Sequence, residues 1–182
     1  MIITISGKAG AGKSTVARIL SEKLRIRHYS IGDLMRAMAT DKGVDLLELN
    51  KLAEKDKSID LELDNRLKEL GKTKDNFVVD GRLTAYFIPN AGIRVFLDAD
   101  DNVRAKRILK GKRHGREGKT LKEIMGIIKK REESEKKRYK KYYGVDYLDE
   151  KLYNFTVDTT KMNQNEVVDK IMKFVKAKQK SL

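Results

Sequence analysis

The feature that most constrains this chain is a glycine-rich segment close to its start. Residues 7–14 read GKAGAGKS; they follow the largely apolar residues 2–5 and precede a segment whose apolar residues recur at helical spacing. A strand, a glycine-rich turn and a helix in this order point successive backbone N–H groups at one anion, and the helix adds the positive end of its dipole. The chain is therefore expected to build a phosphate-binding turn after its first strand.

The pattern is that of a P-loop, which assigns roles to its side chains. Lys13 can reach the β- and γ-phosphates of a nucleotide, and the hydroxyl of Ser14 can ligate Mg²⁺. Asp80 ends an apolar run, where an acidic residue near that ion is typical, although it could instead cap the helix that follows. We predict ATP as phosphoryl donor and Mg²⁺ as metal, held by Ser14 and Asp80 directly or through water. The residues predicted to contact ATP are Gly7, Lys8, Ala9, Gly10, Ala11, Gly12, Lys13, Ser14 and Thr15.

Apolar periodicity predicts an α/β chain. Strands are expected at residues 2–5, 27–30, 77–79, 93–97 and 155–157. Helices are expected at residues 14–24, 33–40, 46–55, 59–70, 102–109, 121–143 and 166–178, with Gly71 ending the fourth. Strands that alternate with helices indicate a parallel sheet covered on both faces. At 182 residues the chain is expected to form one domain, 1–182.

Two segments do not fit simple connections between strands. Residues 33–71 are too long for a crossover and too short for a domain, as a mobile cap over a second substrate would be. Residues 110–119, KGKRHGREGK, combine basic side chains with three glycines that permit large changes in φ and ψ. Two such elements beside one nucleotide site suggest an enzyme that closes to exclude water.

Composition limits the partners. The net charge of +14 fits either a nucleic-acid surface or small, highly anionic substrates. Basic strands interleaved with aromatic residues and zinc knuckles are both missing, so we predict small-molecule nucleotides rather than a specific nucleic acid. With no cysteine and no apolar run long enough for a membrane span, the sequence predicts a cytoplasmic protein without membrane contact, which we expect to be a monomer.

Further motifs resemble the nucleoside monophosphate kinases. SIGDLMR at 30–36 is similar to their acceptor-nucleotide motif, and DGR at 80–82 with FLDA at 96–99 is similar to cytidylate kinases. RAKR at 104–107 and REESEKKR at 131–138 are also similar to cytidylate kinases. The compact length and the sequence of residues 30–36 are most like the archaeal type of that enzyme. Adenylate kinases usually have Asp-Gly-Phe-Pro-Arg where this chain has Asp-Gly-Arg-Leu, which counts against AMP as acceptor.

The resemblance covers nearly the whole chain. It implies a three-layer P-loop NTPase fold with a five-stranded parallel sheet in the order 2-3-1-4-5. Residues 33–71 would be the helical insertion that binds the monophosphate, and residues 110–119 a short lid. The implied reaction moves the γ-phosphoryl of ATP onto CMP, and onto dCMP, to give ADP and CDP.

The resemblance also implies a set of cationic side chains. Two unit charges 4 Å apart repel by roughly 4 kcal/mol at an effective dielectric constant near 20, so a site that joins two polyanions needs several fixed cations. Arginine binds phosphate bidentately and stays protonated. Arg36 and Arg82 would hold the acceptor phosphate, and Lys13, Arg131 and Arg138 would be catalytic. Arg131 and Arg138 are two helical turns apart and are expected to point the same way.

The base site is defined by complementarity to cytosine, which offers an amino donor beside carbonyl and ring-nitrogen acceptors. A carboxylate and an arginine would match it, and Asp60, Arg66 and Glu135 are the candidates. Asp60 and Asp64 share a helical face, and Arg66 lies off that face. The complete set predicted to bind CMP is Ser30, Asp33, Arg36, Asp60, Arg66, Arg82 and Glu135. Residues 159, 160 and 163 are expected to border the adenine of ATP.

Other functions stay open from the sequence. The chain could phosphorylate AMP or UMP, act as a nucleotide-dependent RNA-binding module, or phosphorylate a small alcohol with Asp33 as base. Independently of the acceptor, Asp33 could cap its own helix. A monophosphate has a second pKa near 6 and is mostly a dianion at pH 7, so it needs no base. For that reason His28 and His114 are predicted to take no part.

Overall fold

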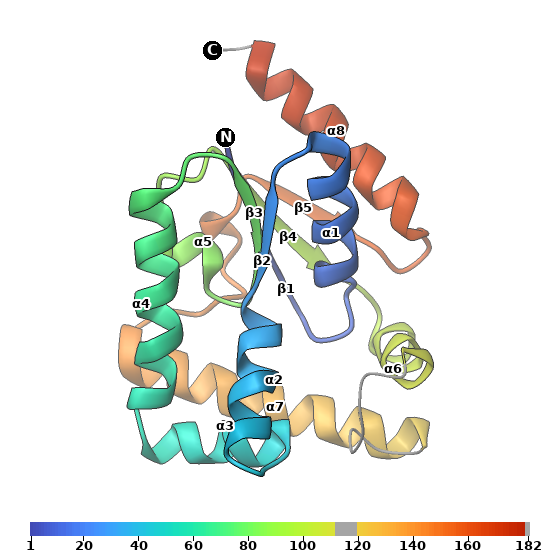
Figure 1. The fold of residues 1–182 in the computed structure, drawn as a ribbon. Coiled ribbons are helices and arrows are strands. Elements are labelled where there is room, and N and C mark those ends of the chain that lie inside the picture. Colours follow the sequence, from blue (N-terminus) through green and yellow to red (C-terminus); the bar gives the residue numbers. More distant parts are fainter. Residues whose placement is uncertain (112–119, 181–182) are drawn as a thin grey trace.

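The computed structural model describes residues 1–111 and 120–180, and its centre is a five-stranded parallel sheet (Figure 1). The strand order is β2-β3-β1-β4-β5, which confirms the order 2-3-1-4-5. All four neighbouring pairs are parallel. The strands are β1 (Ile2–Gly7), β2 (Arg27–Ser30), β3 (Phe77–Asp80), β4 (Ile93–Asp98) and β5 (Phe155–Asp158).

The described helices match the predicted ones closely. They are α1 (Lys13–Leu24), α2 (Ile31–Asp41), α3 (Leu46–Lys55), α4 (Ser58–Thr73), α5 (Thr84–Phe87), α6 (Asp101–Lys110), α7 (Leu121–Tyr143), η1 (Glu150–Leu152) and α8 (Gln164–Lys180). The sequence did not predict α5 and η1, because helices this short show no apolar period. None of the helices described is both long and apolar enough to cross a bilayer.

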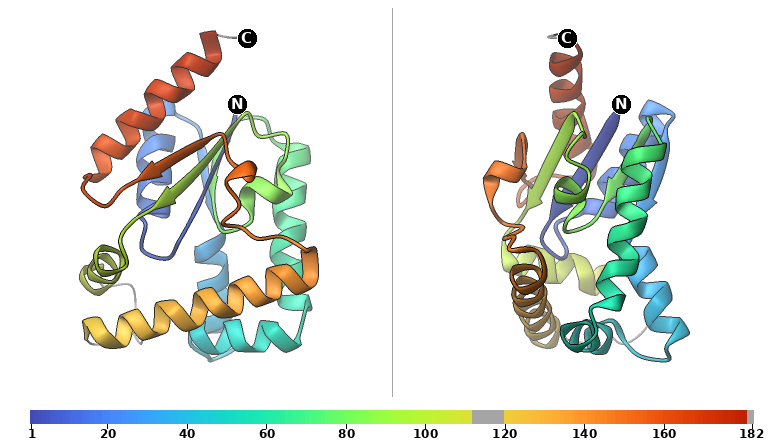
Figure 2. Two further views of the ribbon diagram at one scale, coloured as in Figure 1. Left: turned by 180° about the vertical axis from the view of Figure 1, so that it is seen from behind. Right: turned by 90° about the vertical axis from the view of Figure 1, so that its left-hand side faces the viewer.

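The alternation of side chains along β1 divides the core into two layers. Ile3 and Ile5 pack with Leu20 of α1 and Ile171 of α8 on one face. Ile2 packs on the opposite face, in a core shared with α2, α3, α4, α5 and α7. Figure 2 shows α1 and α8 on one side of the sheet, and α7 running across the carboxyl ends of the strands. The result is the predicted three-layer architecture, with α7 placed over the edge where β1 and β3 end.

Gly71 does not end α4, which continues to Thr73. A Cβ at this position would lie 3.1 Å from Cγ2 of Ile88, so glycine allows α4 to pack closely on the segment after α5. Nδ2 of Asn90 donates to the Gly71 carbonyl at 3.1 Å in the same contact. The prediction of a helix end was therefore wrong, because this glycine serves packing rather than termination.

The structure describes all of one predicted mobile element and two residues of the other. Residues 33–71 contain most of α2 and all of α3, and α4 extends two residues beyond them. The helix α2 begins at Ile31, and the Ser30 hydroxyl accepts a hydrogen bond from the Asp33 amide at 3.4 Å. Ser30 rather than Asp33 is thus the N-cap of this helix. Of the predicted lid, 110–119, only Lys110 and Gly111 are described, and residues 112–119 lie outside the described residues.

Candidate active site

The turn between β1 and α1 is held in place by close backbone contacts. Gly7 has φ +141°, and a Cβ there would lie 2.1 Å from the Leu97 carbonyl oxygen. Gly10 has φ +77°, and its Cβ would lie 2.6 Å from the Arg104 carbonyl oxygen. Both positions require glycine for the backbone angle and for the space. The turn therefore keeps a fixed shape against β4 and α6.

Lys13 is a partly buried cation of this turn. Its Nζ donates to the Lys8 carbonyl at 2.8 Å. Burial lowers the pKa of Lys13 well below its ordinary value, and the neighbouring Arg82 lowers that pKa further, whereas Asp80 raises it. Burial and repulsion by Arg82 both disfavour the charged form of this lysine, so an anionic ligand beside it would stabilise that form.

Asp80 sits at the centre of a polar group at the end of β3. Its Oδ2 accepts from the Ser14 hydroxyl at 2.8 Å, and its Oδ1 lies 2.7 Å from Nε2 of His28. The hydroxyl of Ser30 donates to Asp80 at the longer distance of 3.4 Å. The prediction that His28 takes no part is thus not supported by its position, since it holds the carboxylate beside the P-loop.

The pair Ser14 and Asp80 fits Mg²⁺. One hydroxyl and one carboxylate are hard oxygen ligands, and Mg²⁺ is commonly held by one or two carboxylates together with substrate phosphates. Among the described residues there is no group of three or more His, Asp or Glu side chains that could hold a metal ion alone. Mg²⁺ held by Ser14 and Asp80 would complete its coordination with water and substrate phosphates.

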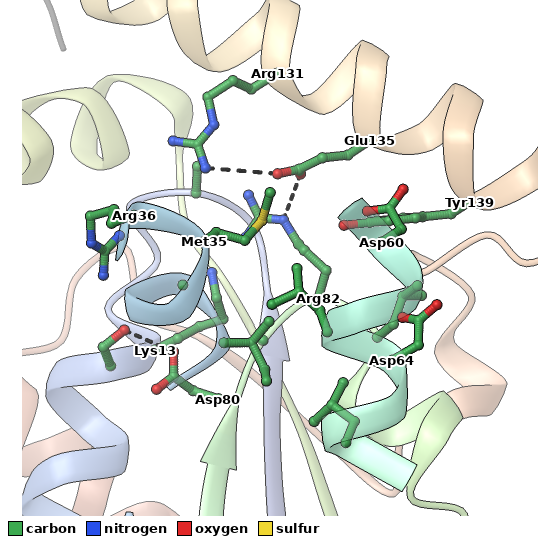
Figure 3. Close-up of a pocket in the computed structure, with 18 of the residues that line it drawn as sticks. Lys13, Met35, Arg36, Asp60, Asp64, Asp80, Arg82, Arg131, Glu135 and Tyr139 are labelled. Atoms are coloured by element: carbon green, nitrogen blue, oxygen red, sulfur yellow. Dashed lines mark hydrogen bonds and ion pairs between the residues drawn. The ribbon is translucent and has the colours of Figure 1, made fainter. Parts of the chain in front are cut away.

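A cavity that is partly open to solvent lies between the P-loop, α2, α4 and α7 (Figure 3). It brings together side chains from distant parts of the chain at the carboxyl edge of the sheet. The predicted site residues that line it are Ala9, Gly10, Lys13, Ser14, Arg36, Asp60, Asp80, Arg82, Arg131 and Glu135. Ligands of parallel α/β folds bind at this edge, so the cavity is the candidate acceptor site.

Arg82 and Arg131 meet at one buried carboxylate. Nε of Arg82 donates to Oε2 of Glu135 at 2.7 Å, and its Nη1 donates to the Gly7 carbonyl at 2.7 Å. Nη2 of Arg131 lies 3.8 Å from Oε1 of Glu135. Burial raises the pKa of Glu135, but Arg82 and Arg131 outweigh it and hold that pKa below the ordinary value. Glu135 lines the cavity, yet both its oxygens face guanidinium groups, which is a different role from the base contact expected of it.

Arg138 does not line this cavity. Its side chain is 1% exposed, and Nη2 donates to Oδ1 of Asn50 on α3 at 3.0 Å. Its Nε lies 3.5 Å from Oδ2 of Asp60. Arg131 and Arg138 share one side of α7, as predicted, but α7 passes over the cavity at Arg131 and over α3 at Arg138. The structure therefore places the predicted catalytic Arg138 behind the cavity wall.

Three residues predicted to bind CMP do not line this cavity. Ser30, Asp33 and Arg66 line a groove on the outer side of α2 and α4. The exposed Asp33 pairs with Arg36 one turn along α2, and Arg66 donates to Glu62 at 3.0 Å. Arg66 is directed outward because Asp60, Leu63, Asp64 and Leu67 occupy the inner face of α4. Asp60 and Arg66, both predicted to contact the base, therefore lie on different faces of α4.

A second cavity lies on the other side of the P-loop. Gly10, Ala11, Gly12, Lys13, Ser14, Thr15, Arg107, Thr159 and Asn163 are among its lining residues. Of the residues predicted to border adenine, Thr159 and Asn163 line this cavity, whereas the Thr160 hydroxyl donates to Asp158 at 2.6 Å. Gly7 and Lys8 line neither cavity, because the Gly7 carbonyl binds Arg82 and the Lys8 ammonium pairs with Asp98 at 2.9 Å.

Two arginines of α6 support the site without having been predicted to do so. Arg107 donates to the Thr159 carbonyl at 2.7 Å beside the second cavity. The buried Arg104 donates from Nη1 to the Ala9 carbonyl at 2.9 Å and pairs with Glu132 at 2.6 Å. Arg104 therefore ties the P-loop to α7. The signal was present in the RAKR motif at 104–107, but a motif alone does not show what its arginines contact.

Comparison with known proteins shows the family to which the chain belongs. Residues 2–161 match the cytidylate kinase-like family. The chain belongs to that family. It is 40% identical over 180 residues to the cytidylate kinase of Halobacterium salinarum, with 98% of this chain and 91% of the relative covered. It is 39% identical to that of Archaeoglobus fulgidus, covering 98% of this chain and 96% of the relative.

Solved structures agree on the fold of this member of the cytidylate kinase-like family. The shikimate kinase of Bacteroides thetaiotaomicron superposes with a TM-score of 0.65 over 97% of this chain and 98% of the other. The sequence identity is 17%, so this likeness speaks for the P-loop kinase fold and not for the acceptor.

Proposed function

We propose that this chain transfers the γ-phosphoryl of ATP to CMP, and to dCMP, forming ADP and CDP. The observation that carries the proposal is that the two cavities share the P-loop residues Gly10, Lys13 and Ser14. A triphosphate bound from one side and a monophosphate bound from the other would meet at Lys13. Such an arrangement would hold the γ-phosphoryl of the donor next to the phosphate of the acceptor, as direct transfer requires.

The acceptor cavity supplies the fixed positive charge that this meeting requires. Arg82 and Arg131 lie on the α7 side of Lys13, and Arg36 lies on the α2 side (Figure 3). Glu135 restricts both Arg82 and Arg131, so their guanidinium groups are oriented before the substrate arrives. Preorganised cations stabilise the charge that develops on the transferred group without reorganising during the reaction.

The reaction needs no general base in this cavity. An oxygen of the CMP phosphate, mostly deprotonated at pH 7, attacks the γ-phosphorus. The new phosphorus–oxygen bond forms as the bond to the β–γ bridging oxygen breaks, and ADP leaves with that electron pair. Lys13, Arg82 and Arg131 neutralise the oxygens that carry charge in this step. Ser14 and Asp80 would hold Mg²⁺, which supplies further charge neutralisation when bound.

Residues 33–71 are proposed to bind the acceptor, because α2 and α4 provide one wall of its cavity. A single copy is proposed to be active, since residues of one chain line both cavities.

A panel of acceptors tests the proposal. With ATP and Mg²⁺, ADP release is measured for CMP, dCMP, UMP, AMP and shikimate, and RNA binding is titrated in parallel. CMP and dCMP should give the highest kcat/KM, at least about 10-fold above AMP. Lys13→Ala should lower all transfer by about 100-fold or more. Preferred turnover of AMP, UMP or shikimate, or tight RNA binding without transfer to any monophosphate, would overturn the proposal.

A further inference from the structure

Two buried carboxylates on α4 form part of the wall of the acceptor cavity. Asp60 and Asp64 are each 4% exposed, and both line the cavity one helical turn apart. Leu63 and Leu67 lie beside them on the same face of the helix. Buried carboxylates in an apolar wall are costly unless partners satisfy them, so each one calls for a specific account.

The two carboxylates differ in their partners. Asp60 faces Arg138, whose Nε lies 3.5 Å from its Oδ2. Asp64 forms no ion pair within the described part of the chain, and one of its oxygens, Oδ2, accepts a hydrogen bond from the Tyr143 hydroxyl of α7. Asp60 is thus an ion-pair partner of α7, although its Oδ2 accepts no hydrogen bond. Asp64 lines the same cavity and has only one oxygen engaged, by Tyr143.

Tyr143 fixes the direction of this carboxylate. Its ring packs edge-on against Phe87, with ring centroids 5.3 Å apart, so the hydroxyl has little freedom. Burial raises the pKa of Asp64 to about 6, and the hydrogen bond from Tyr143 opposes that rise. At neutral pH the group is therefore mainly an anion that can accept, but not donate, a hydrogen bond.

We propose that Asp64, oriented by Tyr143, selects the acceptor base by accepting a hydrogen bond from an exocyclic amino group. Cytosine presents an amino donor at C4, where uracil presents a carbonyl acceptor. A carboxylate facing that position attracts the first base and repels the second. This assignment rests on the proposed function, and it moves base selection away from Arg66 and Glu135.

The test compares kcat/KM for CMP with that for UMP in four variants. In Asp64→Asn the side chain keeps its shape but can donate to the uracil carbonyl, so the CMP-to-UMP ratio should fall about 10- to 100-fold with an absolute gain for UMP. Tyr143→Phe leaves the carboxylate without its orienting donor and should lower the ratio less. Glu62→Gln, the same chemical change on the exposed face of α4, should leave the ratio and the activity unchanged. Asp60→Asn should affect CMP and UMP equally.

The results distinguish a failure of the Asp64 assignment from a failure of the proposed function. A ratio that stays within about twofold of wild type in Asp64→Asn, or that falls equally in Asp60→Asn, would overturn the assignment. Calorimetric binding of CMP and UMP without ATP gives the same comparison if turnover is lost, and circular dichroism checks folding. Wild-type protein that does not phosphorylate CMP would instead overturn the proposed function, so the two failures are distinguishable.

Discussion

The carboxyl group of Asp64 changes its charge within a pH range in which the protein can be assayed. Its pKa, raised by burial to about 6, means that the carboxylate is charged above that pH and neutral below it. The groups that face it are Tyr143 from α7 and Asp60, Lys57 and Lys68 from α4 and its N-cap; Asp60 raises the pKa, and the two lysines lower it. The charged acceptor is therefore present at neutral pH and is lost on acidification.

We expect the CMP-to-UMP ratio of kcat/KM to fall as the pH is lowered from 8 to 5, with its midpoint near pH 6. Both acceptors share the same phosphate titration near pH 6, so the ratio cancels it and isolates the base contact. Asp64→Asn should show a ratio that does not change with pH. A wild-type ratio that is constant over this range would contradict the assignment.

Single residues were predictable where a local motif specifies their chemistry. Lys13, Ser14 and Asp80 lie where the motifs place them, because the strand, turn and helix fix these positions. The pairing of Asp64 with Tyr143 joins residues 79 positions apart. No periodicity or motif encodes which side chain of α7 meets a given residue of α4, so this contact could only come from the fold.

At the scale of elements, α7 carries two arginines with different tasks. Arg138 is buried against α3 and Asp60, whereas Arg131 faces the cavity beside Glu135. Arg138→Met should lower the free energy of unfolding by about 3–5 kcal/mol, because it leaves the buried Asp60 without its cation. Arg131→Met should instead lower kcat by about 100-fold or more.

Chemical denaturation and steady-state kinetics on both variants separate these effects. Each variant serves as the control for the other, since both replace an arginine of the same helix with the same apolar side chain. Equal losses of turnover at unchanged stability would show that Arg138 acts on the substrate, as the sequence first suggested.

The spacing of Arg131 and Arg138 predicted that both side chains point the same way, but it could not predict what each one contacts. Side chains seven residues apart lie on the same face of a helix. The helix α7 is long enough for that face to contact different neighbours along its length. Gly71 is a similar case, because its close contact with Ile88 depends on an element 17 residues further along. Local patterns located these elements well and could not say what each one packs against.

At the scale of the molecule, the strand order and the three layers followed from the alternation of segments and from the resemblance. The helices α2, α3 and α4 between β2 and β3 also had the expected place. What the sequence could not supply was that the two cavities share the P-loop and that α7 closes one of them. Those features depend on how layers far apart in the chain meet at one edge of the sheet.

The most direct test is the binding of a bisubstrate nucleotide in which a polyphosphate chain joins adenosine to cytidine. Calorimetry should show one molecule bound per chain, more tightly than ATP or CMP alone and displaced by either, because a single ligand would span both cavities. Arg82→Gln should weaken this binding by at least about 10-fold. Binding no tighter than that of ATP, or displacement by only one of the two nucleotides, would contradict a site in which donor and acceptor meet at Lys13.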